Sequence, residues 1–162
     1  VTARSHLGVL EYHQRNWSAA ENHLRGVLAI DPRNADARFY AGMVEVNRKN
    51  MAAAQKHFED LKSFASADSR AYYGLGLVYV AGAHFEKAVE SFTKCLQLDE
   101  KYLDARWELG KIYESTGSRE EAYREFKKIL LADKEYRLKD ILKEKLTLLR
   151  EQGVADDDWQ NF

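Results

Sequence analysis

The chain has 162 residues, of which 45% are hydrophobic and 31% are charged, and its formal net charge is −1. This composition is typical of one globular domain, and the near-neutral charge without a basic stripe gives no basis for nucleic-acid binding. No apolar run approaches the roughly 20 residues that cross a bilayer, and no signal peptide is recognisable. We therefore expect neither a nucleic-acid partner nor membrane insertion.

The amino terminus and the single cysteine leave the compartment undecided. The chain begins with VTARSHLG, already in a helical pattern and without an initiator Met, so we interpret it as a segment of a longer protein. Cys95 alone cannot build a disulfide framework or a cysteine zinc cage. The cytoplasm is slightly favoured over the periplasm.

A 34-residue period runs through most of the chain, and such a period is the signature of a repeat architecture. The columns in register are Gly8, Gly42, Gly76 and Gly110; Ala3, Ala37, Ala71 and Ala105; Ala20, Ala54, Ala88 and Ala122; Leu24, Phe58, Phe92 and Phe126; and Val27, Leu61, Cys95 and Ile129. We divide residues 1–136 into four copies, which are 1–34, 35–68, 69–102 and 103–136.

Each copy has the pattern of two amphipathic helices. In the third copy, Leu75, Val78 and Tyr79 share one helical face, and the segment AGAHF separates them from a second apolar stripe. The turn signals RNW, KNM and STGS divide the other copies. Strand-type alternation is absent and Pro32 is the single proline, so we expect an all-helical chain.

The glycine column lies inside the first helix of each copy, where a glycine costs about 1 kcal/mol relative to alanine. Four glycines in register predict close packing, in which a helix approaches so near that a β-carbon would clash. Helices of about 14 residues are marginal when isolated, so the pairs should stack on one another as a solenoid.

This pattern resembles the tetratricopeptide repeat family, with its consensus W-x2-L-G-x2-Y followed by A, F and P over 34 residues. The matching residues are Leu7, Gly8, Trp17, Ala20, Leu24 and Pro32; Gly42, Ala54 and Phe58; Leu75, Gly76, Tyr79, Phe85, Ala88 and Phe92; and Leu109, Gly110, Tyr113, Ala122 and Phe126. The departures are Glu11 and Glu45 in place of Tyr, and Ser66, Glu100 and Lys134 in place of Pro. The resemblance implies an all-α, right-handed α-solenoid of four helix-turn-helix repeats.

The segment 137–153 is amphipathic, and a terminal solenoid face needs a cover. We expect a capping helix that ends at Gly153 and has one apolar side formed by Leu138, Ile141, Leu142 and Leu149.

Residues 154–162 form an acidic tail with two aromatic residues, Trp159 and Phe162. We expect this tail to be flexible. In a second interpretation, it docks into the groove of a neighbouring molecule or folds back onto the capping helix.

An aromatic column follows the family's tryptophan position by one residue, a rotation of about 100° around a helix. Arg106 occupies that tryptophan position and Trp107 follows it. The resemblance implies that the rotated column faces the concave groove lined by the first helices. The residues assigned to this groove are Val9, Tyr12, Phe39, Tyr40, Met43, Val46, Arg70, Tyr73, Leu77, Val80, Trp107 and Lys111.

An exposed apolar surface rich in aromatic residues and methionine is typical of a protein-binding site. The main hypothesis is therefore a non-catalytic adaptor whose groove holds a peptide with hydrophobic anchors, while Arg70, Arg106 and Lys111 orient its polar ends. The same aromatic residues could instead pack between neighbouring first helices. A second hypothesis is a structural scaffold that self-associates, either groove to tail or edge to edge.

Some members of the family hold the C-terminal carboxylates of heat-shock chaperones with a clamp of basic and amide side chains. The corresponding positions here are Ser5, Val9, Tyr40, Arg70 and Gly74. Only Arg70 carries a charge, so we do not expect chaperone-tail binding.

Residues suited to catalysis or metal binding are not grouped in the sequence. His6 and His13 lie two helical turns apart without a third ligand, and the glycines of YYGLGLVY do not follow a strand. Cys95 falls in an apolar column that indicates a buried thiol. We therefore expect neither enzymatic activity nor a cofactor or metal ion.

Overall fold

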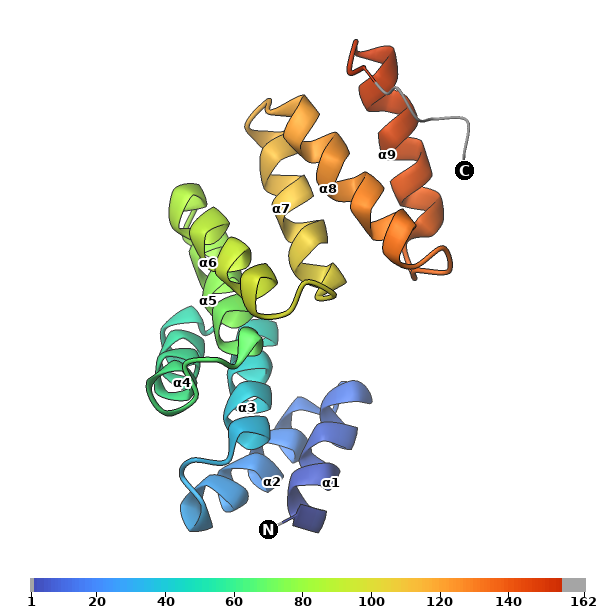
Figure 1. Ribbon diagram of the computed structural model, residues 1–162. Helices are drawn as coiled ribbons and strands as arrows, with labels where there is room; N and C mark the ends of the chain where they lie inside the picture. The colour runs from blue at the N-terminus through green and yellow to red at the C-terminus, as the bar shows by residue number, and fades with distance from the viewer. Residues whose placement is uncertain (1, 156–162) are drawn as a thin grey trace. The chain divides into compact units, whose positions relative to one another are not determined.

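The computed structural model describes residues 2–155, and the regular structure within them is entirely helical (Figure 1). The helices are α1 (Thr2–His13), α2 (Trp17–Ile30), α3 (Ala35–Asn47), α4 (Met51–Phe64), α5 (Ser69–Ala81), α6 (Phe85–Leu98), α7 (Leu103–Ser115), α8 (Arg119–Ala132) and α9 (Lys139–Glu151). None of these described helices has the length and apolar character needed to span a membrane. The expected all-α fold is confirmed.

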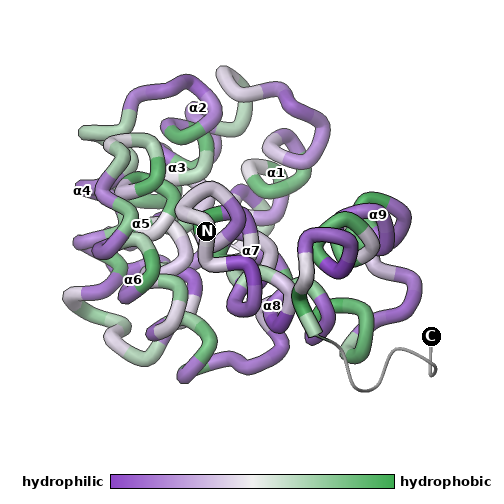
Figure 2. The backbone as a smooth tube through the Cα atoms, turned by 90° about the horizontal axis from the view of Figure 1, so that it is seen from above, coloured by the Kyte–Doolittle hydropathy of each residue, from purple (hydrophilic) through white to green (hydrophobic). Residues whose placement is uncertain are grey.

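The helices recur with the period of the sequence. The second helices α2, α4, α6 and α8 begin 34 residues apart, as do the first helices α3, α5 and α7. Hydrophobic and hydrophilic residues alternate along them, as amphipathic helices require (Figure 2). The chain forms two compact units, residues 1–98 with α1 to α6 and residues 99–162 with α7 to α9.

In residues 1–98, three helix pairs pack in succession. Each first helix contacts its own second helix, α2 contacts α3, α4 contacts α5, and the first helices α1, α3 and α5 also contact in order. The second helices contribute fully buried residues at the predicted columns, which are Ala20, Leu24 and Val27; Ala54, Phe58 and Leu61; and Ala88, Phe92 and Cys95. The interpretation of Cys95 as a core thiol is thus confirmed.

The glycine column marks close approach between a first helix and a large side chain of its own second helix. A β-carbon on Gly42 would lie 2.5 Å from Cε1 of Phe58, and one on Gly74 would lie 2.4 Å from Cδ1 of the same ring. The Phe58 ring therefore fills the space between α3 and α5. Equivalent contacts confirm the prediction for the rest of the column, with Gly8 against Leu24, Gly76 against Phe92 and Gly110 against Phe126.

The turn after each first helix has one conformation in all four copies. The positive-φ residues are Arg15 (62°), Lys49 (62°), Ala83 (56°) and Gly117 (81°). In the fourth copy, the amide of Ser118 donates to the carbonyl of Tyr113 at 2.8 Å, and the other copies repeat this bond. This is the Schellman helix end, which favours glycine at the left-handed position.

In residues 99–162, α7 pairs with α8 and α9 packs against α8. Leu142, Leu146 and Leu149 of α9 are buried in a core formed with residues of α8. The prediction for Ile141 is wrong, because its side chain is 45% exposed. The buried stripe follows the spacing of three and four residues, and Ile141 is rotated by about 100° from Leu142.

The end of α9 agrees with the expected stop. The helix ends at Glu151, and Gly153 has a φ of 97°. The next residue, Val154, is buried against the core that contains Leu149, so the region assigned to the tail begins with an anchored residue.

Candidate functional site

The first helices of residues 1–98 carry a set of uncharged side chains that are only half-buried. We call this set the first-helix surface. Its members are Val9 and Tyr12 of α1; Tyr40, Met43 and Val46 of α3; and Tyr73, Leu77 and Val80 of α5. Since α1, α3 and α5 contact one another in order, these side chains come from three adjacent helices.

Aromatic contacts join α1 to α3 within the first-helix surface. The ring of Tyr12 lies 5.2 Å from that of Tyr40 in an edge-to-face arrangement, and 5.4 Å from Trp17. His13 adds an edge contact to Tyr40 at 5.8 Å. Burial raises the pKa of the Tyr40 hydroxyl, which therefore remains protonated and able to donate at neutral pH. Sequence reasoning did not include His13 or Trp17 in the site, although both lie beside Tyr12.

Phe39 belongs to the core and not to an open surface. Its side chain is 7% exposed, and its ring lies 6.1 Å from that of Phe58. For this residue, the alternative of packing between helices is the one observed. Tyr73, one repeat later in the same column, stays half-buried with its ring 5.9 Å from Phe92.

Arg70 is held by carboxylates of its own unit. Its guanidinium makes ion pairs of 2.7 Å with both Asp68 and Asp36, and lies 5.4 Å from the centre of the Phe39 ring. The hydrogen bond to Asp68 is the largest influence that raises the pKa of Arg70 above its usual value. A peptide carboxylate would have to compete with these two partners.

Two assigned residues, Trp107 and Lys111, lie on α7 in the second unit. Trp107 is half-buried against Phe126, with the ring centres 5.4 Å apart. The ammonium group of Lys111 is 2.7 Å from Glu108 and 6.0 Å from the Trp107 ring centre. Lys111 is therefore paired with a carboxylate and lies beside the indole of Trp107.

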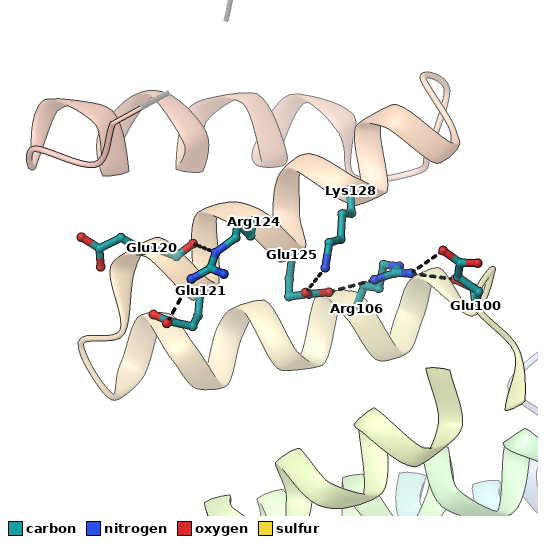
Figure 3. A network of polar contacts seen from close by, with 7 residues as sticks. All are labelled: Glu100, Arg106, Glu120, Glu121, Arg124, Glu125 and Lys128. Carbon is teal, nitrogen blue, oxygen red and sulfur yellow. Dashed lines mark hydrogen bonds and ion pairs between the residues drawn. The ribbon is translucent and has the colours of Figure 1, made fainter. Parts of the chain in front are cut away.

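Arg106 does not point freely toward a ligand, which corrects the orienting role expected for it. It is 9% exposed, and its guanidinium lies 3.1 Å from the Glu125 carboxylate, as Figure 3 shows. It also donates to the carbonyl of Glu100 at 3.1 Å. At the consensus tryptophan position, this chain has a buried ion pair.

Metal-ligating groups do not gather in threes anywhere within residues 2–155. The acidic tail, with Trp159 and Phe162, falls in 156–162, which lie outside the described residues. Its expected docking therefore stays a prediction.

Solved structures of repeat proteins resemble this fold. TTC0263, a thermophilic TPR protein of Thermus thermophilus, superposes with a TM-score of 0.78 at 18% identity, covering 93% of this chain and 81% of that one. For pilF of Pseudomonas aeruginosa the TM-score is 0.81 at 21% identity, with coverages of 93% and 68%. For MamA of Desulfovibrio magneticus RS-1 it is 0.68 at 25% identity, with coverages of 83% and 76%.

Sequence comparison identifies the repeat directly. No curated protein matches the chain significantly. Two family models, both described as Tetratricopeptide repeat, match residues 6–71 and 79–143 and together cover most of the sequence. The helix pairs, their 34-residue period and these matches agree, and the chain belongs to the tetratricopeptide repeat family.

Proposed function

We propose that this chain is a non-catalytic adaptor that binds a peptide segment of a protein partner on the first-helix surface. Tetratricopeptide repeats are in general protein–protein interaction modules without catalytic activity, which supports the broad class. The observation that carries the specific proposal is the set of eight uncharged, half-buried side chains on three adjacent helices. Aromatic and methionine side chains bury large areas at modest entropic cost, as interface anchors do.

The chemistry of this surface favours a ligand with apolar anchors. Arg70, the nearest assigned cation, is engaged by Asp68 and Asp36. Binding would therefore depend on two or three hydrophobic side chains of the peptide that contact Tyr40, Met43 and Tyr73. A helical or an extended peptide can present such anchors at regular spacing.

A peptide array tests this proposal. Each peptide of the array carries two or three apolar residues at helical or extended spacing, and scrambled peptides serve as references. We expect Met43→Ala with Tyr73→Ala to weaken capture at least about tenfold, because two anchor contacts are lost. The matched control is Ile30→Ala, which removes a 67% exposed side chain from α2. This helix is a second helix of its repeat and does not contribute to the first-helix surface. Equal capture by the double variant and the control, with both folded by circular dichroism, would remove the first-helix surface from consideration.

The two units can be separated by a further variant. Trp107→Ala alters only residues 99–162. If it weakens capture as strongly as the double variant, residues 99–162 also contribute to binding; if capture is unchanged, binding depends on α1, α3 and α5.

One observation favours self-association as a second candidate function. Leu7 and Leu10 of α1 are 46% and 51% exposed. One period later, Val44 occupies the column of Leu10 and is buried, and two periods later Leu75 occupies that of Leu7 and is buried too. The apolar edge of α1 is therefore of the kind that a preceding helix covers elsewhere in the chain.

Sedimentation distinguishes the two candidates. An adaptor should remain monomeric at tens of micromolar, whereas a scaffold should associate with increasing concentration. Leu7→Glu with Leu10→Glu would dissociate an edge-to-edge oligomer, and deletion of 156–162, which keeps the buried Val154, would dissociate a groove-to-tail one. If the protein is monomeric at every concentration, self-association is refuted and only the adaptor proposal remains.

A further inference from the structure

A pocket of about 320 Å³ lies between α4, α5 and α6, within residues 1–98. We call it the lysine pocket. Helix α4 contributes Lys62, α5 contributes Tyr72 and Tyr79, and α6 contributes Lys87, Ser91 and Lys94. None of the residues that line it belongs to the first-helix surface. A ligand of the lysine pocket would therefore be separate from the peptide of the proposed function.

The three lysine side chains of this pocket are exposed, and none forms an ion pair with a carboxylate of residues 2–155. Two of the ammonium groups lie over aromatic rings. Nζ of Lys62 is 5.5 Å from the centre of the Tyr72 ring, and Nζ of Lys87 is 5.8 Å from that of Tyr79. Nζ of Lys94 lies 3.4 Å from the uncharged amide oxygen of Gln97. The three charges are thus reachable from solvent and are not neutralised by the chain.

Glu90 is the acidic residue among those that line the lysine pocket. It lies three residues after Lys87 and four before Lys94 on α6, yet it forms an ion pair with neither of them. Helix α5, with the sequence SRAYYGLGLVYVA, contains no Asp or Glu. The lining therefore carries three positive charges and one negative charge, which leaves a net charge of +2 at pH 7.

Two hydroxyl groups add uncharged donors to the same lining. The hydroxyls of Tyr79 and Ser91 make no hydrogen bond within the described part of the chain. The hydroxyl of Tyr72, by contrast, donates to the carbonyl of Ser66 at 3.2 Å. Ammonium and hydroxyl groups both donate to the oxygen atoms of anions, so the available donors suit an anionic ligand.

The equivalent pocket one repeat earlier shows that the fold does not impose this charge. That pocket lies between α2, α3 and α4, and its lining has two arginines and two glutamates. Glu45 occupies there the position of Tyr79, and it pairs with Arg48 at 3.6 Å. The position of Lys62 holds leucine in the other three repeats, which are Leu28, Leu96 and Leu130. The positive charge of the lysine pocket is therefore specific to this place in the chain.

We propose that the lysine pocket binds a run of acidic residues in a partner protein. Lys87 and Lys94 are two helical turns apart, about 10 Å along α6, and Lys62 comes from another helix. A single phosphate group spans only a fraction of that distance. Three consecutive acidic residues in an extended segment span about 7–10 Å, so their carboxylates match the spread of the three ammonium groups. Complementary charge of this kind also steers the partner toward the pocket.

The test uses the full chain and a labelled peptide in which three consecutive aspartates are flanked by glycine and serine. The reference peptide has asparagine in place of aspartate. Binding is followed by fluorescence polarisation and located by the NMR shifts of the backbone amides of Ser91 and Lys94. In about 50 mM salt, we expect the acidic peptide to bind saturably with a Kd below about 1 mM, and the reference at least about tenfold more weakly. Raising the salt to about 500 mM should weaken binding, because exposed charges are screened.

Three outcomes of these titrations would overturn the proposal. They are equal binding of the two peptides, shifts that do not include Ser91 and Lys94, and an absence of saturation. A further peptide carries one phosphoserine in place of the three aspartates. If it binds more tightly than the acidic peptide, the pocket is a phosphate site and the proposal is wrong.

Variants separate the pocket from general electrostatic attraction. Lys62→Leu introduces the residue of the other three repeats, and together with Lys94→Gln it should weaken binding at least about tenfold. Glu90→Gln removes the negative charge of the lining and should tighten binding about twofold to threefold. The matched control, Lys56→Gln with Arg33→Gln, removes two charges from exposed positions outside the pocket and should change binding less than about threefold. Equal weakening by the two double variants would refute the assignment.

The chain has an acidic run of its own, Asp156, Asp157 and Asp158, which lies outside the described residues. Equal affinity of the full chain and of a chain without 156–162 for the acidic peptide supports a separate partner. A gain of at least about tenfold on deletion would assign the pocket to this run and overturn that part of the proposal. Capture of apolar peptides should not change in Lys62→Leu with Lys94→Gln, so the lysine pocket and the first-helix surface can fail independently.

Discussion

Substitution of Gly42 by alanine should destabilise residues 1–98, although alanine is the better helix former. The added β-carbon would lie 2.5 Å from Cε1 and 2.7 Å from Cζ of Phe58. Carbon atoms in favourable contact are about 3.5–4.0 Å apart, so the ring would have to move by about 1 Å. Phe58 is fully buried, and Gly74 of α5 also approaches its ring, at Cδ1 and Cε1. There is no free space to receive it.

The magnitude follows from two opposing effects. Overpacking of a close-packed core costs about 1–3 kcal/mol, and a fully buried ring approached by two helices belongs to the upper part of that range. The gain in helix propensity from glycine to alanine is about 1 kcal/mol. The steric effect is larger, so we expect Gly42→Ala to lower the free energy of unfolding by about 1–2 kcal/mol, which reduces Tm by roughly 3–6 °C.

Urea denaturation followed by circular dichroism measures this change, and the chain contains a matched control. Gly26 lies within α2, and the atoms nearest to its added β-carbon belong to the guanidinium of Arg4, the end of a flexible, exposed side chain. Gly26→Ala should therefore stabilise the protein by up to about 1 kcal/mol. If Gly42→Ala is as stable as Gly26→Ala, helix propensity dominates and the close-approach argument is wrong.

A double-mutant cycle separates the clash from other effects. Phe58→Leu removes part of the ring that meets the new β-carbon. If the clash is the cause, the double variant with Gly42→Ala will be more stable than the sum of the two single changes implies. Additive effects would assign the loss to something other than this contact.

Three further predictions concern the turns, a buried ion pair and pH. Lys49 adopts a φ of 62° where the fourth copy has Gly117. In thermal melting, Lys49→Gly should therefore raise stability by about 0.5–1 kcal/mol, and Gly117→Ala should lower it by about 1 kcal/mol. Stability changes of the same sign for the two variants would contradict the strain argument. Glu125→Gln removes the nearer of the two carboxylates beside the buried guanidinium of Arg106 and leaves Glu100 at 3.8 Å, so it should cost about 1–3 kcal/mol in urea unfolding, whereas a loss below about 0.5 kcal/mol would indicate a solvated pair. Burial and Arg38 lower the pKa of folded His57, so the unfolded state binds more protons as pH falls through about 6.5, and stability should decline there. His57→Gln should flatten this decline in melts between pH 7 and pH 5, and a profile that matches the unsubstituted protein would assign the decline to other groups.

Much of the architecture could be predicted because repetition amplifies local signals. A single buried glycine is ambiguous, but four in register with apolar columns imply one packing arrangement. The structure bears this out, since Gly8, Gly42, Gly76 and Gly110 each approach the large side chain of their own second helix. The helix ends were harder to predict, because three of the four left-handed turn positions carry Arg, Lys or Ala instead of glycine.

The candidate site could be predicted only in part. The exposure of a side chain depends on residues of neighbouring helices, and its position in the repeat does not specify them. Phe39 and Tyr73 occupy the same column of the repeat, yet Phe39 is buried in the core with Phe58 while Tyr73 is only half-buried. Likewise, the apolar residues of α9 do not reveal which stripe is covered, and Leu146 is buried while Ile141 is exposed. One residue of rotation decides between the two.

The sequence alone therefore determined the helix pairs, their 34-residue period and the family. The reason is that the spacing of apolar residues within one or two turns defines each helix, and the repetition of that spacing defines the period. Only the tertiary structure decided which aromatic residues remain accessible, and which carboxylate pairs with each arginine, with Glu125 beside Arg106 and Asp60 beside Arg38. The physical reason is that a hydrogen bond or a buried surface requires a partner from another helix. The position of that partner is set by packing, and the residue's own type does not specify it.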